Sequence, residues 1–292
     1  MNEFLRTDTA MSALSSMRTG GIAPVAYFPE TEQSLCDTVR RLTEEYKRFF
    51  VFGNLSNVLL PDGTLDFVPV ITTGIKTVTV TDTDDGIKVY AACGVSLTGL
   101  ALEFCRRDYA GLSFAYGIPG TVGGAVFMNA GAYGSEMKNI VRSVRFYDID
   151  ADTVCEIPAA DCGFGYRTSV FAHKNGVILG AFLSLAACEP GTALAEAKEL
   201  MERRREKQPL EYPSCGSAFK RPEGYFAGEL IEKCGLKGYA VGGACVSEKH
   251  AGFVVNKGGA TSADVEKLLC DVRAKVHQTF GVELEPEIRI IK

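Results

Sequence analysis

Residues 117–134 read Gly-Ile-Pro-Gly-Thr-Val-Gly-Gly-Ala-Val-Phe-Met-Asn-Ala-Gly-Ala-Tyr-Gly, with six glycines in eighteen positions and Tyr133 as the one ionisable side chain. Glycine permits positive φ and lets a bulky ligand approach the main chain, so successive amide N–H groups can point at phosphate oxygens. Thr121 and Asn129 stand among apolar residues and need hydrogen-bond partners if buried. The segment predicts a cradle for a nucleotide-like cofactor, and the alternative is a set of tight turns in a compact core.

The two commonest nucleotide-binding patterns are missing from the sequence. No Gly-x-Gly-x-x-Gly follows a predicted strand, and no Gly-x-x-x-x-Gly-Lys-Ser/Thr occurs. A Rossmann dinucleotide site and a P-loop are therefore both disfavoured.

Length and charge narrow the class of protein. The 292 residues, 46% of them hydrophobic, are enough for two lobes with cores of their own. The net charge of −5 comes from interspersed acids and bases, which is not the footprint of a nucleic-acid or anionic-membrane binder.

The N-terminus and the cysteines indicate a soluble protein of a reducing compartment. Residues 1–6 lack the apolar core of a secretory signal, and no stretch approaches the roughly 20 apolar residues of a membrane span. The ten cysteines form no Cys-x-x-Cys pair, so we expect free, mostly buried thiols and no zinc site. We expect a cytoplasmic monomer.

Hydrophobic periodicity predicts an α+β protein with mixed sheets. A helix over 32–47 runs into a buried strand at 49–52, and a helix begins near Ser96. A late helix opens with Thr261 and Asp264 in capping-box positions and stops before Gly281, and a strand follows over 282–290. Further strands are expected at 68–71, 78–80, 87–91, 144–147 and 177–185, and a helix at 194–207. A break near 189–191 divides the chain into domains 1–189 and 190–292, and the segment 282–292 can pack back on the first.

Eight segments in order carry a resemblance that spans nearly the whole chain. They are Arg18-Thr19-Gly20-Gly21, Gly53-Asn54-Leu55-Ser56-Asn57, residues 117–131, Tyr166-Arg167-Thr168-Ser169, residues 213–220, Gly235-Leu236-Lys237-Gly238, Ser247-Glu248-Lys249-His250 and Leu284-Glu285-Pro286-Glu287. With these the sequence resembles the UDP-N-acetylenolpyruvoylglucosamine reductases of bacterial cell-wall synthesis. The family carries FAD in a domain of the vanillyl-alcohol-oxidase type, beside a smaller α+β substrate domain.

The resemblance implies a reaction and a set of binding residues. NADPH would reduce FAD, which would then reduce the enolpyruvyl ether of UDP-N-acetylglucosamine enolpyruvate to UDP-N-acetylmuramate. The spacing in the second lobe resembles the subclass that lacks an inserted tyrosine-bearing loop. Where the family usually has a second glycine, this chain has Leu55, whose Cβ restricts the turn. The residues implied for FAD are Gly53, Asn54, Ser56, Asn57, Gly117, Ile118, Pro119, Gly120, Thr121, Gly123, Gly124 and Asn129, and those for substrate are Tyr133, Lys207 and Lys237.

Three catalytic residues follow from the same resemblance. Arg167 would hold the substrate carboxylate through its two-pronged guanidinium, although an arginine is more often a salt-bridge partner. Ser217 would protonate the carbanion, or else simply cap a turn at Gly216. Glu287 would hydrogen-bond the developing charge, with a carboxyl pKa raised by burial. By the resemblance, Glu287 and not Glu285 matches the catalytic position. The alternation of the expected strand alone does not choose, because both glutamates could face water.

Two other functions remain open at this point. A flavin oxidase or dehydrogenase of the same cofactor fold could act on another alcohol or sugar, since the first lobe alone would support it. A nucleotide sensor without catalysis could use the same cradle. His250 belongs to one of the shared segments, but a lone histidine is more often structural.

Overall fold

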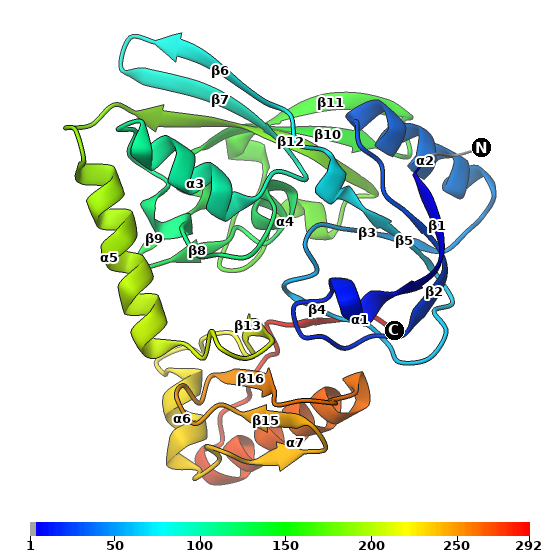
Figure 1. Ribbon diagram of the computed structural model, residues 1–292, viewed down its shortest axis with the longest axis vertical. Helices are drawn as coiled ribbons and strands as arrows, with labels where there is room; N and C mark the ends of the chain where they lie inside the picture. The colour runs from blue at the N-terminus through cyan, green and yellow to red at the C-terminus, as the bar shows by residue number, and fades with distance from the viewer. Residues whose placement is uncertain (1–3) are drawn as a thin grey trace. The chain divides into compact units, whose positions relative to one another are not determined.

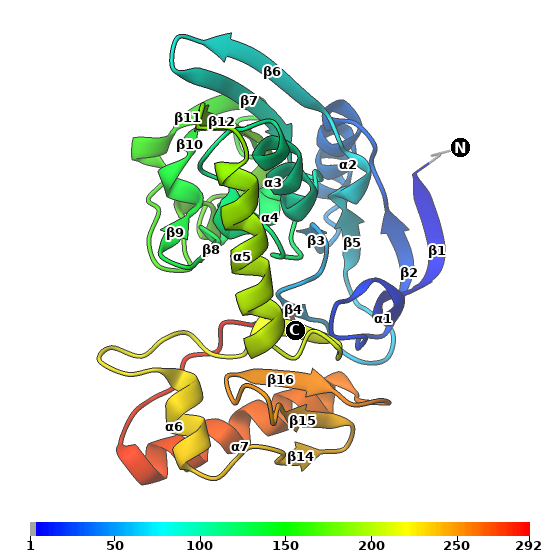
Figure 2. The same ribbon diagram turned by 60° about the vertical axis from the view of Figure 1, so that its left-hand side comes forward.

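The computed structural model describes residues 4–292, whose contacts form two compact units (Figures 1 and 2). The first unit comprises residues 4–6, 25–54 and 67–203, and the second comprises Thr7–Pro24, Leu55–Asp66 and Arg204–Lys292. The chain therefore passes between the units several times. The division expected from the sequence, into a cofactor domain of residues 1–189 and a substrate domain of residues 190–292, stays a prediction.

A small sheet and one helix lie near the start of the chain. The strand order is β1-β2-β5-β3, with β5 parallel to both β2 and β3. The predicted helix and strand are confirmed as α2 (Glu32–Glu44) and β3 (Phe49–Phe52). A capping box of Thr31 and Ser34 begins α2, and the positive φ of 52° at Tyr46 follows its end. The other strands are β1 (Leu5–Ala10), β2 (Ile22–Tyr27) and β5 (Val68–Ile71).

A five-stranded antiparallel sheet, in the order β11-β10-β12-β7-β6, holds most of the first unit's core. Figure 1 shows α3 (Leu97–Arg106) and α4 (Val122–Phe127) beside this sheet. Ser96 caps α3 as expected, with Phe104 fully buried. The strands are β6 (Val78–Thr83), β7 (Gly86–Ala92), β10 (Val141–Asp148), β11 (Thr153–Pro158) and β12 (Gly176–Ala186). Short elements are β8 (Gly131–Ala132), β9 (Ser135–Glu136), η1 (Thr72–Gly74), η2 (Ser113–Ala115), η3 (Met137–Asn139), η4 (Ala159–Asp161) and η5 (Val170–Ala172).

In the second unit a four-stranded antiparallel sheet, in the order β13-β16-β15-β14, shares a core with two helices. The capping box predicted at Thr261 and Asp264 is confirmed, and Gly281 ends the helix with φ of 68°. The elements are α1 (Met11–Leu14), β4 (Val58–Leu59), β13 (Ser214–Ser217), α6 (Ala227–Lys233), β14 (Ala240–Val241), β15 (Ala244–Val246), β16 (Phe253–Asn256), α7 (Ser262–Phe280) and β17 (Arg289–Ile290). The predicted helix 194–207 is α5 (Thr192–Lys207), most of which belongs to the first unit.

The strand predicted over 282–290 is wrong for most of its length, because only β17 is a strand and it pairs in parallel with β4. The preceding backbone changes partner along its path. The N–H of Glu287 donates to the carbonyl of Ala218 at 2.9 Å, whereas the N–H of Arg289 donates to Asn57 at 3.0 Å. Pro286, directly before Glu287, has no N–H to offer a ladder. The alternation that predicted one strand arises because Leu284 and Ile288 are both buried.

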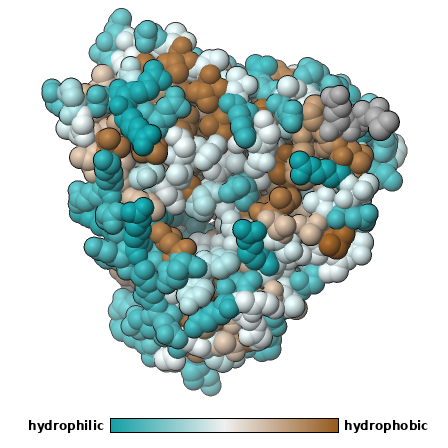
Figure 3. Space-filling model, viewed as in Figure 1, coloured by the Kyte–Doolittle hydropathy of each residue, from teal (hydrophilic) through white to brown (hydrophobic). Residues whose placement is uncertain are grey.

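The hydropathy of the helices and surface and the state of the thiols complete the description of the fold. None of the helices within residues 4–292 is long and apolar enough to cross a membrane. On the face drawn in Figure 3, hydrophobic residues occur as small separate patches among hydrophilic ones. All ten cysteines are free thiols, and burial raises the pKa of Cys93 and of Cys215 to about 12.

Candidate active site

Two loops of the first unit meet where the sequence predicted a cofactor cradle. The end of β3 approaches the 117–124 segment so closely that a Cβ built at Gly53 would lie 2.2 Å from the Thr121 hydroxyl. The side-chain amide of Asn54 donates to the carbonyl of Pro119 at 2.7 Å. Glycine at position 53 is therefore required by the contact with Thr121, and the structure joins two segments that are far apart in the sequence.

Both interpretations of the glycines are partly right. A Cβ at Gly123 would lie 2.8 Å from that of Cys93, and its N–H donates to the Cys93 carbonyl at 2.9 Å, so this glycine serves packing. Gly124 is different, because it is exposed and its Cβ would meet nothing closer than the Thr121 hydroxyl at 3.7 Å. Within residues 4–292, the main-chain N–H groups of Gly120 and Thr121 donate to no protein acceptor.

The loop of residues 54–57 offers a second run of amides. Leu55 takes φ of 48° although it is not glycine, and its side chain is buried. Its carbonyl accepts a hydrogen bond from the N–H of Ser16 at 3.2 Å. Among the described residues, none accepts from the four N–H groups of 54–57. Such a run with one left-handed residue makes an anion-binding concavity, so the loop fits the pyrophosphate of a dinucleotide such as FAD.

The second unit brings the serine and glutamate candidates onto backbone segments that are joined by a hydrogen bond. Ser217 ends β13 with its side chain exposed, and the carbonyl of the next residue, Ala218, accepts from the N–H of Glu287. The carbonyl of Glu287 accepts from the side-chain amide of Asn57 at 3.1 Å. Asn57 therefore holds the backbone at Glu287, a task that no sequence spacing indicated because 230 positions separate them.

Glu285 and Glu287, which the sequence left open, have different surroundings. The Glu285 carboxylate faces solvent, with 69% of the side chain exposed, and pairs with Lys220 at 2.6 Å. Glu287 is half-buried. The contrast favours Glu287 as the functional carboxyl, in agreement with the resemblance.

Arg167 lies in a two-residue turn closed by hydrogen bonds between Gly165 and Thr168. It has φ of 54°, which is unusual for a residue with a Cβ. Its guanidinium donates to the carbonyl of Gly131 at 2.9 Å and lies 5.2 Å from the centre of the Tyr166 ring. The arginine is thus half-buried and oriented by main-chain contacts.

Asn129, expected to contact the cofactor, is completely buried and its amide is bonded to the protein. Its two N–H groups donate to the Glu136 carboxylate at 3.0 Å and to the Gly165 carbonyl at 2.9 Å. Its oxygen accepts from the N–H of Lys138 at 2.9 Å. The side chain therefore holds neighbouring segments together and presents no polar atom to a ligand.

The candidate substrate residues occupy two places. Tyr133 is 43% exposed at the tip of the β8–β9 hairpin. Lys207 ends α5, and Lys237 pairs with Glu232 at 2.6 Å. Burial lowers the pKa of His250, and the nearby charges of Lys237 and Lys207 lower it further. These three basic residues therefore share one neighbourhood of the second unit, where burial and the two lysine charges disfavour the charged imidazole.

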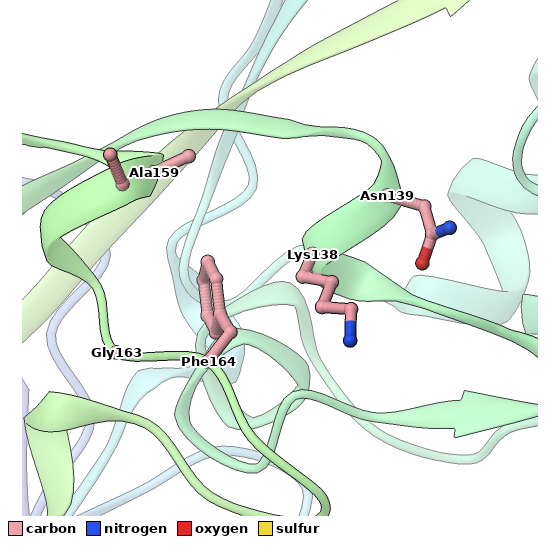
Figure 4. A pocket seen from close by; sticks show the side chains of 6 residues that line it. Lys138, Asn139, Ala159, Gly163 and Phe164 are labelled. Atoms are coloured by element: carbon pink, nitrogen blue, oxygen red, sulfur yellow. The ribbon is translucent and has the colours of Figure 1, made fainter.

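A hollow of about 540 Å³ opens beside the turn that carries Arg167. Figure 4 shows the Phe164 ring between the segments that carry Ala159 and Lys138. The hollow is lined by Lys138, Asn139, Ala159, Ala160, Gly163 and Phe164. It contains none of the residues predicted for cofactor or substrate.

Comparison with known proteins identifies the chain at two levels. The family model of an FAD binding domain matches residues 23–156, which include the loop at 53–57 and the segment from 117. Together with those loops it defines an FAD-dependent oxidoreductase with a cofactor domain of the vanillyl-alcohol-oxidase type, as predicted. A second model, described as the UDP-N-acetylenolpyruvoylglucosamine reductase C-terminal domain, matches residues 208–291. The chain belongs to the UDP-N-acetylenolpyruvoylglucosamine reductase family.

Individual relatives agree over almost the full length. The reductase of that name from Clostridium beijerinckii is 42% identical over 286 residues, covering 98% of this chain and 92% of the relative. The one from Limosilactobacillus reuteri is 42% identical over 295 residues, with 100% and 97% covered. The crystal structure of the reductase from Thermus caldophilus superposes with a TM-score of 0.81 at 30% identity, with 99% and 100% covered. The resemblance predicted from the eight segments is confirmed.

Proposed function

We propose that this protein reduces the enolpyruvyl group of UDP-N-acetylglucosamine enolpyruvate to UDP-N-acetylmuramate, using NADPH, as a cytoplasmic step of peptidoglycan precursor synthesis. The relatives support this substrate, since each is named for it and the similarity extends through the second unit. An oxidase of another alcohol would share only the cofactor domain. A sensor without catalysis would not need the serine and the carboxyl that the family resemblance assigns to Ser217 and Glu287.

The chemistry sets two tasks for side chains of this chain. FAD, when bound, supplies the carrier that takes a hydride from NADPH and delivers it to the terminal carbon of the enolpyruvyl double bond. Delivery leaves an electron pair on the adjacent carbon, delocalised into the carboxylate. That charge must be stabilised, and the carbon must gain a proton.

Arg167 and Glu287 perform the first task. A guanidinium stays charged at any physiological pH and forms two parallel hydrogen bonds to a carboxylate. The bond from the Arg167 guanidinium to the Gly131 carbonyl orients this group. Glu287 in its protonated form donates one further hydrogen bond to the same developing charge.

Ser217 performs the second task. Its O–H bond breaks as the new C–H bond forms, and the alkoxide regains a proton from water. The observation that carries the proposal is the bond between Glu287 N–H and the Ala218 carbonyl, because it joins the backbone next to Ser217 to the backbone of Glu287. Lys207, Lys237 and Tyr133 bind the charged remainder of the substrate, and Gly53, Ser56, Asn57 and the main-chain amides of Gly120 and Thr121 hold the flavin.

The test separates the two half-reactions in a stopped-flow experiment. In Ser217→Ala, reduction of the flavin by NADPH is expected at the wild-type rate, whereas anaerobic reoxidation by the enolpyruvyl substrate slows by two or more orders of magnitude, the loss of a general acid. Ser214→Ala, on the same strand, is the control and keeps both rates. Full reoxidation by Ser217→Ala contradicts the proton-donor role, and a protein that cannot be reconstituted with FAD contradicts the function as a whole.

A further inference from the structure

We propose that buried Asn129 is a positioning residue for Arg167: it clamps the turn of residues 165–168 so that the guanidinium is held ready for the substrate carboxylate. The inference rests on the role of Arg167 in the proposed function. It replaces the expectation that Asn129 contacts the cofactor.

The turn needs an external clamp because its backbone is strained. The left-handed region brings a Cβ close to the following carbonyl oxygen, and Arg167 lies there with φ of 54°. Such conformations persist only where surrounding contacts fix them. A two-residue turn on its own has one pair of hydrogen bonds, between Gly165 and Thr168, at 3.1 and 3.4 Å.

Three hydrogen bonds tie this turn to residues 127–131. The Asn129 amide donates to the Gly165 carbonyl at 2.9 Å, before the turn, and the hydroxyl of buried Ser169 donates to the Phe127 carbonyl at 2.7 Å, after it. The third joins the Arg167 guanidinium itself to the Gly131 carbonyl. The segment that holds the turn at both ends also orients the charged group.

Asn129 suits this task in both side chain and backbone. With φ of 42° it needs a residue that tolerates the left-handed region, which asparagine does better than most residues with a Cβ. Its second N–H is fixed by Glu136, whose carboxylate also pairs with Lys138 at 2.5 Å. The amide therefore cannot rotate away without leaving buried groups unpaired.

The main variant is Asn129→Asp, which keeps the acceptor for the Lys138 N–H and replaces the donor by an oxygen facing the Gly165 carbonyl. The matched control is Asn256→Asp in the second unit, where a buried amide likewise donates to a carbonyl, that of Met17, at 3.0 Å. Both variants are expected to have a lower free energy of unfolding than wild type. Asn129→Asp alone is expected to slow reoxidation by the enolpyruvyl substrate about 10- to 100-fold, the cost of a misplaced group. Flavin affinity and reduction by NADPH stay within twofold of wild type.

Arg167→Met serves as the reference background. If Asn129 acts through Arg167, adding Asn129→Asp to Arg167→Met slows the substrate step no further. A wild-type substrate step in Asn129→Asp, an equal loss in both half-reactions, or the same loss in Asn256→Asp overturns the inference. A wild-type substrate step in Arg167→Met overturns the role of Arg167 in the proposed function, and the inference falls with it.

A milder variant covers the case in which Asn129→Asp does not fold. Ser169→Ala removes one neutral hydrogen bond of the same clamp, and the substrate step should slow about two- to tenfold. An unchanged substrate step in Ser169→Ala then overturns the inference.

Discussion

Replacing Gly53 by alanine tests whether the contact between the two flavin loops shapes the cofactor site. The new Cβ would lie 2.2 Å from the Thr121 hydroxyl and 3.3 Å from its Cβ and Cγ2. To restore an ordinary contact, one loop must retreat by about 1 Å, a strain for which overpacking typically costs about 1–3 kcal/mol. If that cost falls on cofactor binding, the Kd for FAD rises about 5- to 150-fold.

The assay is a titration of apoprotein with FAD, followed by quenching of flavin fluorescence, beside urea unfolding of the same apoprotein. Gly99→Ala is the control, because its Cβ would lie 3.5 Å from Ser96 within α3, and alanine there should stabilise by about 0.5–1 kcal/mol. Adding Thr121→Ala to Gly53→Ala removes the clashing hydroxyl and should recover most of the affinity. Wild-type FAD affinity and stability in Gly53→Ala, or no recovery in the double variant, would refute the reasoning.

Two other substitutions test local devices of the fold. Leu55→Gly relieves the strain of a left-handed residue, worth roughly 1 kcal/mol, but removes a buried side chain worth about 2 kcal/mol. The free energy of unfolding in urea should therefore fall by about 1 kcal/mol. A more stable variant would show that the leucine is only tolerated. At Asp264, hydrogen bonding from Thr261 lowers the carboxyl pKa, so its contribution to stability is present above the unfolded value of about 4 and is lost as the pH falls through the lowered pKa. The thermal midpoint of wild type should therefore exceed that of Asp264→Asn at neutral pH and converge with it in acid; a gap that stays constant with pH would contradict this account.

Local patterns predicted much of the fold correctly because they depend on neighbours in sequence. The capping box at Thr261 and Asp264, the glycine stop at Gly281 and the helix-to-strand unit of α2 and β3 all involve residues within a few positions of one another. Periodicity failed over 282–290, where alternating burial was real but the backbone took its partners from two different segments. Side-chain alternation reports which face is buried and carries no information about which chain lies alongside.

The sequence by itself determined the flavin-binding family and the identity of the residues available for catalysis, since eight short segments kept their order and composition. Only the tertiary structure decided what those residues do to one another. Asn129 turned from an expected ligand contact into the support of a turn 36 positions away, and Asn57 was found to hold the backbone of Glu287 across 230 positions. A buried amide must be bonded wherever the fold places it, and its partner is set by how distant segments pack, which no spacing in one sequence records.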